Sequence, residues 1–410
     1  MENKKRLYAQ IILKKCLKLD SNQPLVIRGT YENYDIIRLV YEEALKIGSK
    51  DIYLDVYDSY ITKALYENLT EEELLENKYF SREKYEEYAK KDAAFLMLST
   101  ETPGIMDNID PNIISSIRNH ISKTCEHFDQ RRDKNELSWC IAVAPTKIWA
   151  DKIFPGKENS LEMLWEKIFE INYLNESNPL EKIDKNIEEK ITLCKKLNNL
   201  NLKSLKFKNS IGTDVTMDLL EDGVWCSGLT KLKNGKEVIV NYPSVEIFTS
   251  PNKYTVNGKI VSSLPLLVSG VIVEGIEVEI KEGKIVNVKS ETSQEVITKL
   301  IKEDEGADYI GEIALVEDDS PINNTGILYY TTLLDENAKC HFAFGSGFSE
   351  CVNTNKELTK EEKDNIGLNE SKTHVDVMFG TKDLDVVGIT KDNEEIKIFT
   401  NGNFSKEIKK

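Results

Sequence analysis

The chain has few histidines and lacks the signatures of several protein classes. Only four histidines occur among its 410 residues. No run approaches the roughly 18 apolar residues that a membrane-spanning helix needs. Residues 1–6 are mostly polar and lead into an amphipathic pattern, which is not typical of a signal peptide. No GxGxxG motif or phosphate-binding loop follows an expected strand. We therefore expect no membrane partner and no nucleotide cofactor.

Basic residues are outnumbered by acidic ones. Lys and Arg total 54 and Asp and Glu total 70, so the formal net charge is −16. Such a balance disfavours nucleic acids and anionic membrane surfaces as partners. It suits a cationic small molecule such as a protonated amine, although an acidic surface is explained more simply by solubility. The hydrophobic fraction of 40% and charged fraction of 30% are typical of a soluble globular protein.

The seven cysteines are scattered, odd in number and without CxxC spacing. This usage favours reduced thiols and a cytoplasmic location. Cys340 stands directly beside His341. It could serve as a metal ligand or nucleophile, or it could be a small apolar residue of the interior.

The N-terminal half alternates expected helices and strands. Residues 7–19 and 35–47 have helical periodicity, and residues 24–29 and 51–56 resemble buried strands. Further strands are expected near residues 93–98 and 139–144. This β-α-β order predicts a parallel sheet covered by helices. A polar, helix-prone stretch over 160–200 is expected to connect this α/β domain, residues 1–200, to a second domain.

From residue 203 onward the pattern changes to short β-like runs between turn signals. Glu282-Gly283 predicts a hairpin turn, and residues 294–303 predict a helix. We expect residues 201–410 to form a mainly antiparallel α+β domain that binds metal. The runs that predict strands are 204–208, 214–218, 237–241, 267–273, 276–281 and 284–289.

Acids and imidazoles gather in this second half. Glu246 and Glu312 lie among apolar neighbours, where an unpaired carboxylate is costly to bury. His341 follows the polar cluster 335–338, and in a strand His374 and Asp376 would point to the same face. Each feature alone also fits an ordinary core histidine or a solvent-facing acid. Together they are a ligand set that can hold zinc, cobalt or manganese with open positions for water and substrate. The sequence thus points to hydrolysis at a metal centre.

Residues 241–376 resemble the thermophilic-type metallo-aminopeptidases, a family that includes aminopeptidases T and S. Several motifs recur in the family's order over more than a hundred residues, which makes the resemblance specific. The matching runs are 241–249, 304–307, 311–316, 320–322, 325–326, 335–338, His341 and 374–376.

The resemblance implies an enzyme that removes N-terminal residues from peptides with a free N-terminus. It implies two divalent ions, from zinc, cobalt, manganese or magnesium, that activate a water molecule. It also implies a homodimer. Glu312 or Glu336 could act as the base, and the ligand that bridges the metals is left open. The implied metal ligands are Glu246, Glu312, Glu336, His341, His374 and Asp376.

One position departs from the family pattern. The family commonly places a tyrosine seven residues after its first histidine, and Phe348 stands there in this chain. Phenylalanine has no hydroxyl to donate a hydrogen bond. Another donor could substitute, activity could be altered, or the chain could belong to a different branch. Two alternatives follow: a hydrolase of other amides or esters, and a catalytically silent protein that binds metal or peptide. A ligand-binding module on the N-terminal sheet has little support.

Overall fold

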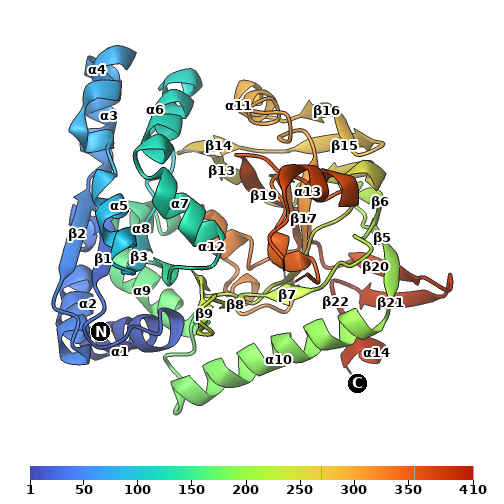
Figure 1. Cartoon of the computed structure of the whole chain (residues 1–410), viewed down its shortest axis with the longest axis horizontal. Helices are drawn as coiled ribbons and strands as arrows, with labels where there is room; N and C mark the ends of the chain where they lie inside the picture. The colour runs from blue at the N-terminus through green and yellow to red at the C-terminus, as the bar shows by residue number, and fades with distance from the viewer. Residues whose placement is uncertain (269, 355, 410) are drawn as a thin grey trace. The chain divides into compact units, whose positions relative to one another are not determined.

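A computed structural model describes residues 1–268, 270–354 and 356–409 (Figure 1). The chain divides into two compact units. The first contains Met1–Ile183 and Gly228–Ser244, with a short stretch at Val271, and the second contains most of the remainder. The change of unit falls inside helix α10 (Pro179–Asn199), ahead of the division expected at residue 200. The two-domain division at that residue stays a prediction.

The first unit is built on a parallel five-stranded sheet. Its strand order is β10-β4-β3-β1-β2, and each neighbouring pair is parallel. Strands β1, β2, β3 and β4 each begin and end within one residue of a predicted run. The predicted parallel sheet is confirmed. The fifth, β10, comes from the end of the run expected at 237–241. The bounds are β1 Leu25–Thr30, β2 Ile52–Tyr57, β3 Ala94–Ser99, β4 Trp139–Val143 and β10 Asn241–Tyr242.

Helices separate these strands in sequence. The predicted helix over 35–47 is α2, which ends where Gly48 takes a φ of +113° and its N–H bonds to the carbonyls of Ala44 and Leu45. Glycine adopts that left-handed conformation without steric penalty. The bounds are α1 Glu2–Ile11, α2 Tyr34–Ile47, α3 Ser59–Asn68, α4 Glu71–Glu76, α5 Glu83–Lys90, α6 Pro111–Thr124, α7 Glu126–Asp133, α8 Lys147–Ile153 and α9 Ser160–Ile171.

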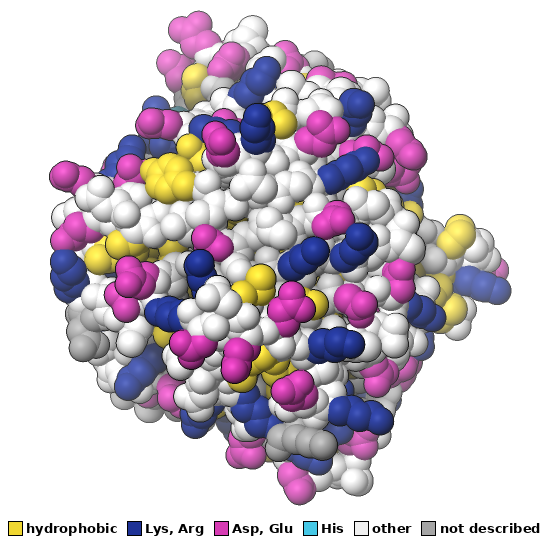
Figure 2. Space-filling view, turned by 90° about the vertical axis from the view of Figure 1, so that its right-hand side faces the viewer, with side chains coloured by type: hydrophobic (Ala, Val, Ile, Leu, Met, Phe, Trp, Pro, Cys, Tyr) yellow, Lys and Arg dark blue, Asp and Glu magenta, His cyan; other side chains and the backbone are white. Residues whose placement is uncertain are grey.

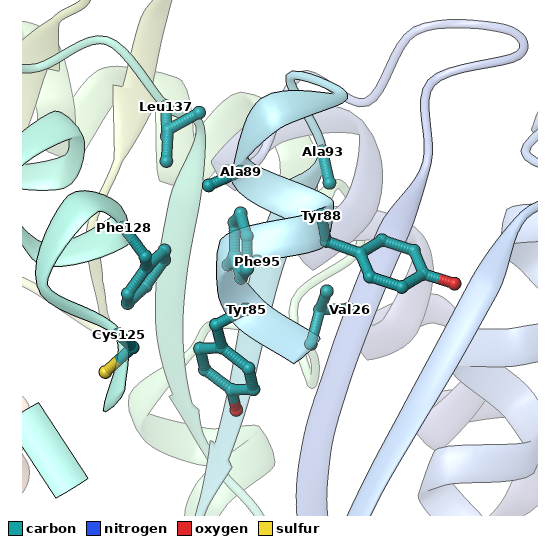
Figure 3. Packing of buried hydrophobic residues seen from close by; sticks show 9 residues of the cluster. All are labelled: Val26, Tyr85, Tyr88, Ala89, Ala93, Phe95, Cys125, Phe128 and Leu137. Atoms are coloured by element: carbon teal, nitrogen blue, oxygen red, sulfur yellow. The ribbon is translucent and has the colours of Figure 1, made fainter. Parts of the chain in front are cut away.

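Helices α5 and α7 bury their apolar side chains against one face of the parallel sheet (Figure 3). Phe95 of β3 is at the middle of this cluster and is 5% exposed. Its ring centroid lies 4.4 Å from that of Phe128 and 5.6 Å from that of Tyr85. Val26 of β1 belongs to the same cluster. This packing therefore holds helices α5 and α7 against strands β1 and β3.

The second unit contains two antiparallel sheets. One has eight strands in the order β16-β15-β12-β6-β5-β20-β21-β22, and the other has five in the order β19-β18-β17-β11-β7. The expectation of a mainly antiparallel C-terminal region is confirmed. At the predicted hairpin, Glu282 and Gly283 both have positive φ, as a tight two-residue turn requires. The larger sheet comprises β5 Leu202–Lys208, β6 Asp214–Asp218, β12 Asn257–Val261, β15 Glu277–Lys281, β16 Lys284–Lys289, β20 Asp385–Thr390, β21 Glu395–Thr400 and β22 Asn403–Phe404.

The smaller sheet carries the residues considered below. Aromatic side chains join it to the larger sheet, with the Phe379 ring 5.7 Å from Phe207 of β5 and 6.3 Å from Phe342 of β18. The face of the smaller sheet that carries Phe342 therefore packs in the core of this unit. The strands are β7 Cys226–Ser227, β11 Ile247–Thr249, β17 Ile310–Leu315, β18 His341–Gly345 and β19 His374–Met378; the helices of the second unit are α11 Gln294–Leu300, α12 Thr332–Asp335, α13 Lys360–Ile366 and α14 Lys406–Lys409.

Surface chemistry is consistent with the composition. On the face seen in Figure 2, acidic and basic side chains are intermingled, and neither sign forms a continuous field. Within the ranges that the structure describes, no helix combines the length and apolar character needed to cross a bilayer.

Replacing Phe95 by alanine tests the aromatic cluster. We expect the free energy of unfolding to fall by about 3–5 kcal/mol, because a buried ring is lost and a cavity is left between α5, α7 and the sheet. Met97 of the same strand is 39% exposed, so Met97→Ala should change the free energy of unfolding by less than about 1 kcal/mol. Urea denaturation followed by circular dichroism gives both values. Equal losses of stability in the two variants would contradict the placement of Phe95 at the middle of the cluster.

Candidate metal centre

The register of the five-stranded sheet brings the predicted site residues of β17, β18 and β19 to one face. Ala343 of β18 pairs with Glu312 on one side and with Asp376 on the other. Directly paired residues of antiparallel strands point to the same face, and so do residues two apart along a strand. His341 is two residues before Ala343, and His374 is two before Asp376. This is the face opposite to the one that Phe342 presents to the core.

The first cluster on this face consists of Glu246, Glu312 and His341. Each offers one ligand atom, and these atoms lie within 4.8 Å of one another. Glu246 directly precedes β11. Its Oε2 lies 3.2 Å from Nε2 of His341, and all three residues are buried.

The second cluster consists of Glu312, His374 and Asp376. Nε2 of His374 lies 3.2 Å from Oε2 of Glu312 and 3.3 Å from Oδ1 of Asp376. As expected from the H-x-D spacing, both residues of β19 point the same way. Glu312 belongs to both clusters, so each has one imidazole and two carboxylates and the two share a carboxylate.

Backbone carbonyls fix the orientation of both imidazole rings. Nδ1 of His341 lies 2.9 Å from the carbonyl oxygen of Glu336, and Nδ1 of His374 lies 2.8 Å from that of Ser346. A carbonyl can only accept, so we infer that each Nδ1 carries the proton. Each Nε2 then faces the carboxylates, which is the arrangement of a histidine that binds a metal and is oriented by a second hydrogen bond.

The electrostatics of the clusters call for positive charge. Burial lowers the pKa of His341, but its contact with Glu246 and the other acids raise it to about 10. Burial raises the pKa of Glu312 to about 7, against the opposing effect of His374. Asp376 Oδ1 is buried and faces Nε2 of His374. Carboxylate oxygens that converge in a buried site are stabilised by positive charge, so these residues fit divalent metal ions.

Glu336 lies near these residues but belongs to neither cluster. Its side chain is buried, and Oε1 accepts a hydrogen bond of 3.3 Å from Nδ2 of Asn337. Burial raises its pKa well above the ordinary value, with further contributions from Asp376 and Glu246. The geometry of the clusters does not test whether Glu336 is a metal ligand, so that role stays a prediction.

Phe348 and Cys340 have distinct surroundings. The ring of Phe348 lies 4.8 Å from that of His374 and packs edge-on against Phe248 at 5.3 Å, so it lines the second cluster. The thiol of Cys340 instead contacts the backbone of Val316, and burial raises its pKa to about 12. A thiol so protected from ionisation is a poor nucleophile. The interior reading of Cys340 therefore fits its environment.

Comparison with known proteins places this chain in a family. The family model described as thermophilic metalloprotease (M29) matches residues 1–404. The chain belongs to the M29 thermophilic metalloprotease family. That membership confirms the resemblance found in residues 241–376 and extends it over the N-terminal half, where no motif had been matched.

Relatives of this M29 chain match over almost their whole length. It is 34% identical over 403 residues to Aminopeptidase AmpS of Bacillus subtilis (strain 168), covering 97% of both chains. It is 30% identical over 406 residues to Aminopeptidase T of Thermus aquaticus, covering 98% of both. The solved structure of wild-type AmpT from Thermus thermophilus superposes with a TM-score of 0.89 at 28% identity, covering 98% of this chain and 99% of that one. The predicted enzyme class, a metal-dependent aminopeptidase, is confirmed.

Proposed function

We propose that this M29 enzyme hydrolyses the first peptide bond of peptides with a free N-terminus, using two divalent cations held by the two clusters. The observation that carries the proposal is the sharing of Glu312: two ligand sets of equal composition meet at one carboxylate. His341 and Glu246 complete one set, and His374 and Asp376 complete the other. Glu312 would therefore help to hold both ions.

The chain's own residues have separable roles in this reaction. Divalent ions bound here would supply Lewis acidity toward an amide carbonyl and lower the pKa of water. His341 and His374 are held in the ligating tautomer by the carbonyls of Glu336 and Ser346. The Phe348 ring packs against the His374 ring.

Glu336 is the carboxylate that we assign to proton transfer. Glu312 is shared by the two clusters and so is committed to holding ions, whereas Glu336 is buried beside them and outside both. Besides burial, Asp376 and Glu246 raise the pKa of Glu336 and His341 lowers it, which supports a Glu336 carboxylate close to both clusters. It would accept the proton of the attacking water and return it to the leaving amine.

The acidic site also suits the substrate end that an aminopeptidase must recognise. A free α-amino group would bind one of the cations or pair with a carboxylate of the site, which would restrict cleavage to N-terminal residues. Carboxylate and imidazole donors accommodate zinc, cobalt or manganese, and carboxylates accommodate magnesium. The homodimer and the cytoplasmic location stay predictions.

Removal of metal tests the reaction. A strong chelator should abolish cleavage of aminoacyl-p-nitroanilides, and addition of zinc, cobalt, manganese or magnesium one at a time should restore it. N-acetylated versions of the same substrates are the control, and they should resist cleavage because they lack a free amine. Undiminished turnover after chelation would rule out a metal mechanism. Equal cleavage of acylated substrates would favour a hydrolase of other amides.

Metal stoichiometry tests the sharing of Glu312. Glu312→Gln removes a ligand from both clusters, whereas Asp376→Asn removes one from the second cluster alone. After equilibrium dialysis against zinc, elemental analysis should find about two ions per wild-type chain. Asp376→Asn should retain one, and Glu312→Gln should retain less than Asp376→Asn. Equal metal content in the two variants would argue against a Glu312 that helps to hold both ions.

Phe348→Tyr tests the departure from the family pattern. A hydroxyl beside His374 would add a hydrogen-bond donor at the reacting centre, where one such donor is worth about 10²–10³ in kcat. We expect kcat to rise by about tenfold or more, with unchanged zinc content. Phe348→Leu is the matched control, since it changes the ring without adding a donor. A tyrosine variant no faster than the leucine variant would show that the hydroxyl is not needed here.

If wild-type and Phe348→Tyr proteins both bind zinc tightly but cleave no peptide, the chain is a silent metal-binding relative. That outcome would retain the metal centre and overturn the proposed activity.

A further inference from the structure

Asn337 is completely buried and connects two parts of the metal centre that are far apart in sequence. Its Oδ1 accepts a hydrogen bond of 2.7 Å from the backbone N–H of Val245, 92 residues earlier. Its Nδ2 donates to the carbonyl of Leu333 at 3.0 Å and to Oε1 of Glu336 at 3.3 Å. The exposed fraction of the residue is 0%. Three of the four hydrogen-bonding positions of the amide are thus used.

We propose that Asn337 is a positioning residue of the catalytic centre: it holds the Glu246 backbone through Val245 and orients the Glu336 carboxylate through its amide. The inference rests on the proposed function, because it assigns those two carboxylates to metal binding and proton transfer. Asn337 itself needs to touch neither substrate nor ion.

The contact with Val245 reaches a segment that lies outside any strand. Val245 and Glu246 lie outside any strand, directly before the three-residue strand β11. The 2.7 Å hydrogen bond therefore fixes the backbone one residue ahead of the Glu246 ligand. A ligand attached to an unfixed loop samples several positions and binds metal less tightly.

The contact with Glu336 controls the direction of a carboxylate. Glu336 lies in the turn that follows α12, between Asp335 and Asn337. Asp335 anchors the start of that turn, since its carboxylate accepts from the N–H groups of Tyr329 at 2.9 Å and Thr331 at 3.1 Å. Asn337 anchors its end. The acid–acid–amide run 335–337 is thus two anchors around one reactive group.

Two substitutions separate these actions. Asn337→Ala removes both. Asn337→Asp keeps an acceptor for the Val245 N–H but replaces the donor to Glu336 by a carboxylate oxygen. The alanine variant should bind zinc about 10–100-fold more weakly, the range found when a group that orients a metal ligand is lost. The aspartate variant should keep zinc affinity within about threefold but lose at least about tenfold in kcat, with little change in KM.

Zinc affinity is measured on metal-stripped full-length protein by competition with a chromophoric chelator, and kcat and KM are measured at saturating zinc. Asn209→Ala is the matched control. Asn209 is a buried amide of the same unit, with Oδ1 accepting from the Thr213 N–H at 3.0 Å and Nδ2 donating to the Phe379 carbonyl at 3.0 Å. Its loss should lower the thermal midpoint, as the loss of Asn337 does, and leave zinc affinity unchanged.

Wild-type zinc affinity and wild-type kcat in both Asn337 variants would overturn the inference, while peptide cleavage by the wild type would leave the proposed function intact. Equal losses of zinc affinity in Asn209→Ala and Asn337→Ala would also overturn it, since general destabilisation would then explain both. Should Asn337→Ala fail to fold, the aspartate variant still decides: an unaltered kcat contradicts the proposal. A wild type that binds zinc but cleaves nothing contradicts the proposed function alone, and zinc affinity then still tests the action on Glu246.

Discussion

The second unit depends on one constraint: several acids and the imidazole of His341 are buried, together with the half-buried His374, on a single face of a sheet. Buried carboxylates repel one another and lose hydration, so such a cluster is stable only when positive charge or hydrogen-bond donors compensate it. The chain supplies the imidazoles of His341 and His374 within 3.2–3.3 Å of the acids. The fit to divalent cations and the raised pKa of His341 both follow from that compensation.

Strand pairing makes this concentration of charge possible. The antiparallel register between β17, β18 and β19 places Glu312 and Asp376 across the small Ala343, which leaves room between the acidic side chains. The opposite face of the same strands carries Phe342, which packs against Phe379. One sheet thus buries apolar groups on one side and polar groups on the other, so its core packing supports the site without taking part in it.

The buried hydrogen bonds around the clusters explain why the acidic cluster 335–338 matters beyond Glu336. Asp335 accepts from two backbone N–H groups, and Asn337 makes two of its three hydrogen bonds with backbone groups, which makes them part of the framework. Asp335 and Asn337 flank Glu336, and their hydrogen bonds hold the turn that carries its side chain.

Sequence alone determined the parallel N-terminal sheet, the antiparallel C-terminal region, the six candidate ligands and the family, because hydrophobic periodicity and ordered motifs are local signals. It could not show that Glu312 is common to two clusters, that neither cluster contains Glu336, or that the Cys340 thiol contacts the backbone of Val316. It also missed Asn337, whose partner Val245 is 92 residues away. Those features depend on strand register and on loops meeting in space, and only the tertiary structure decides which distant side chains share a face.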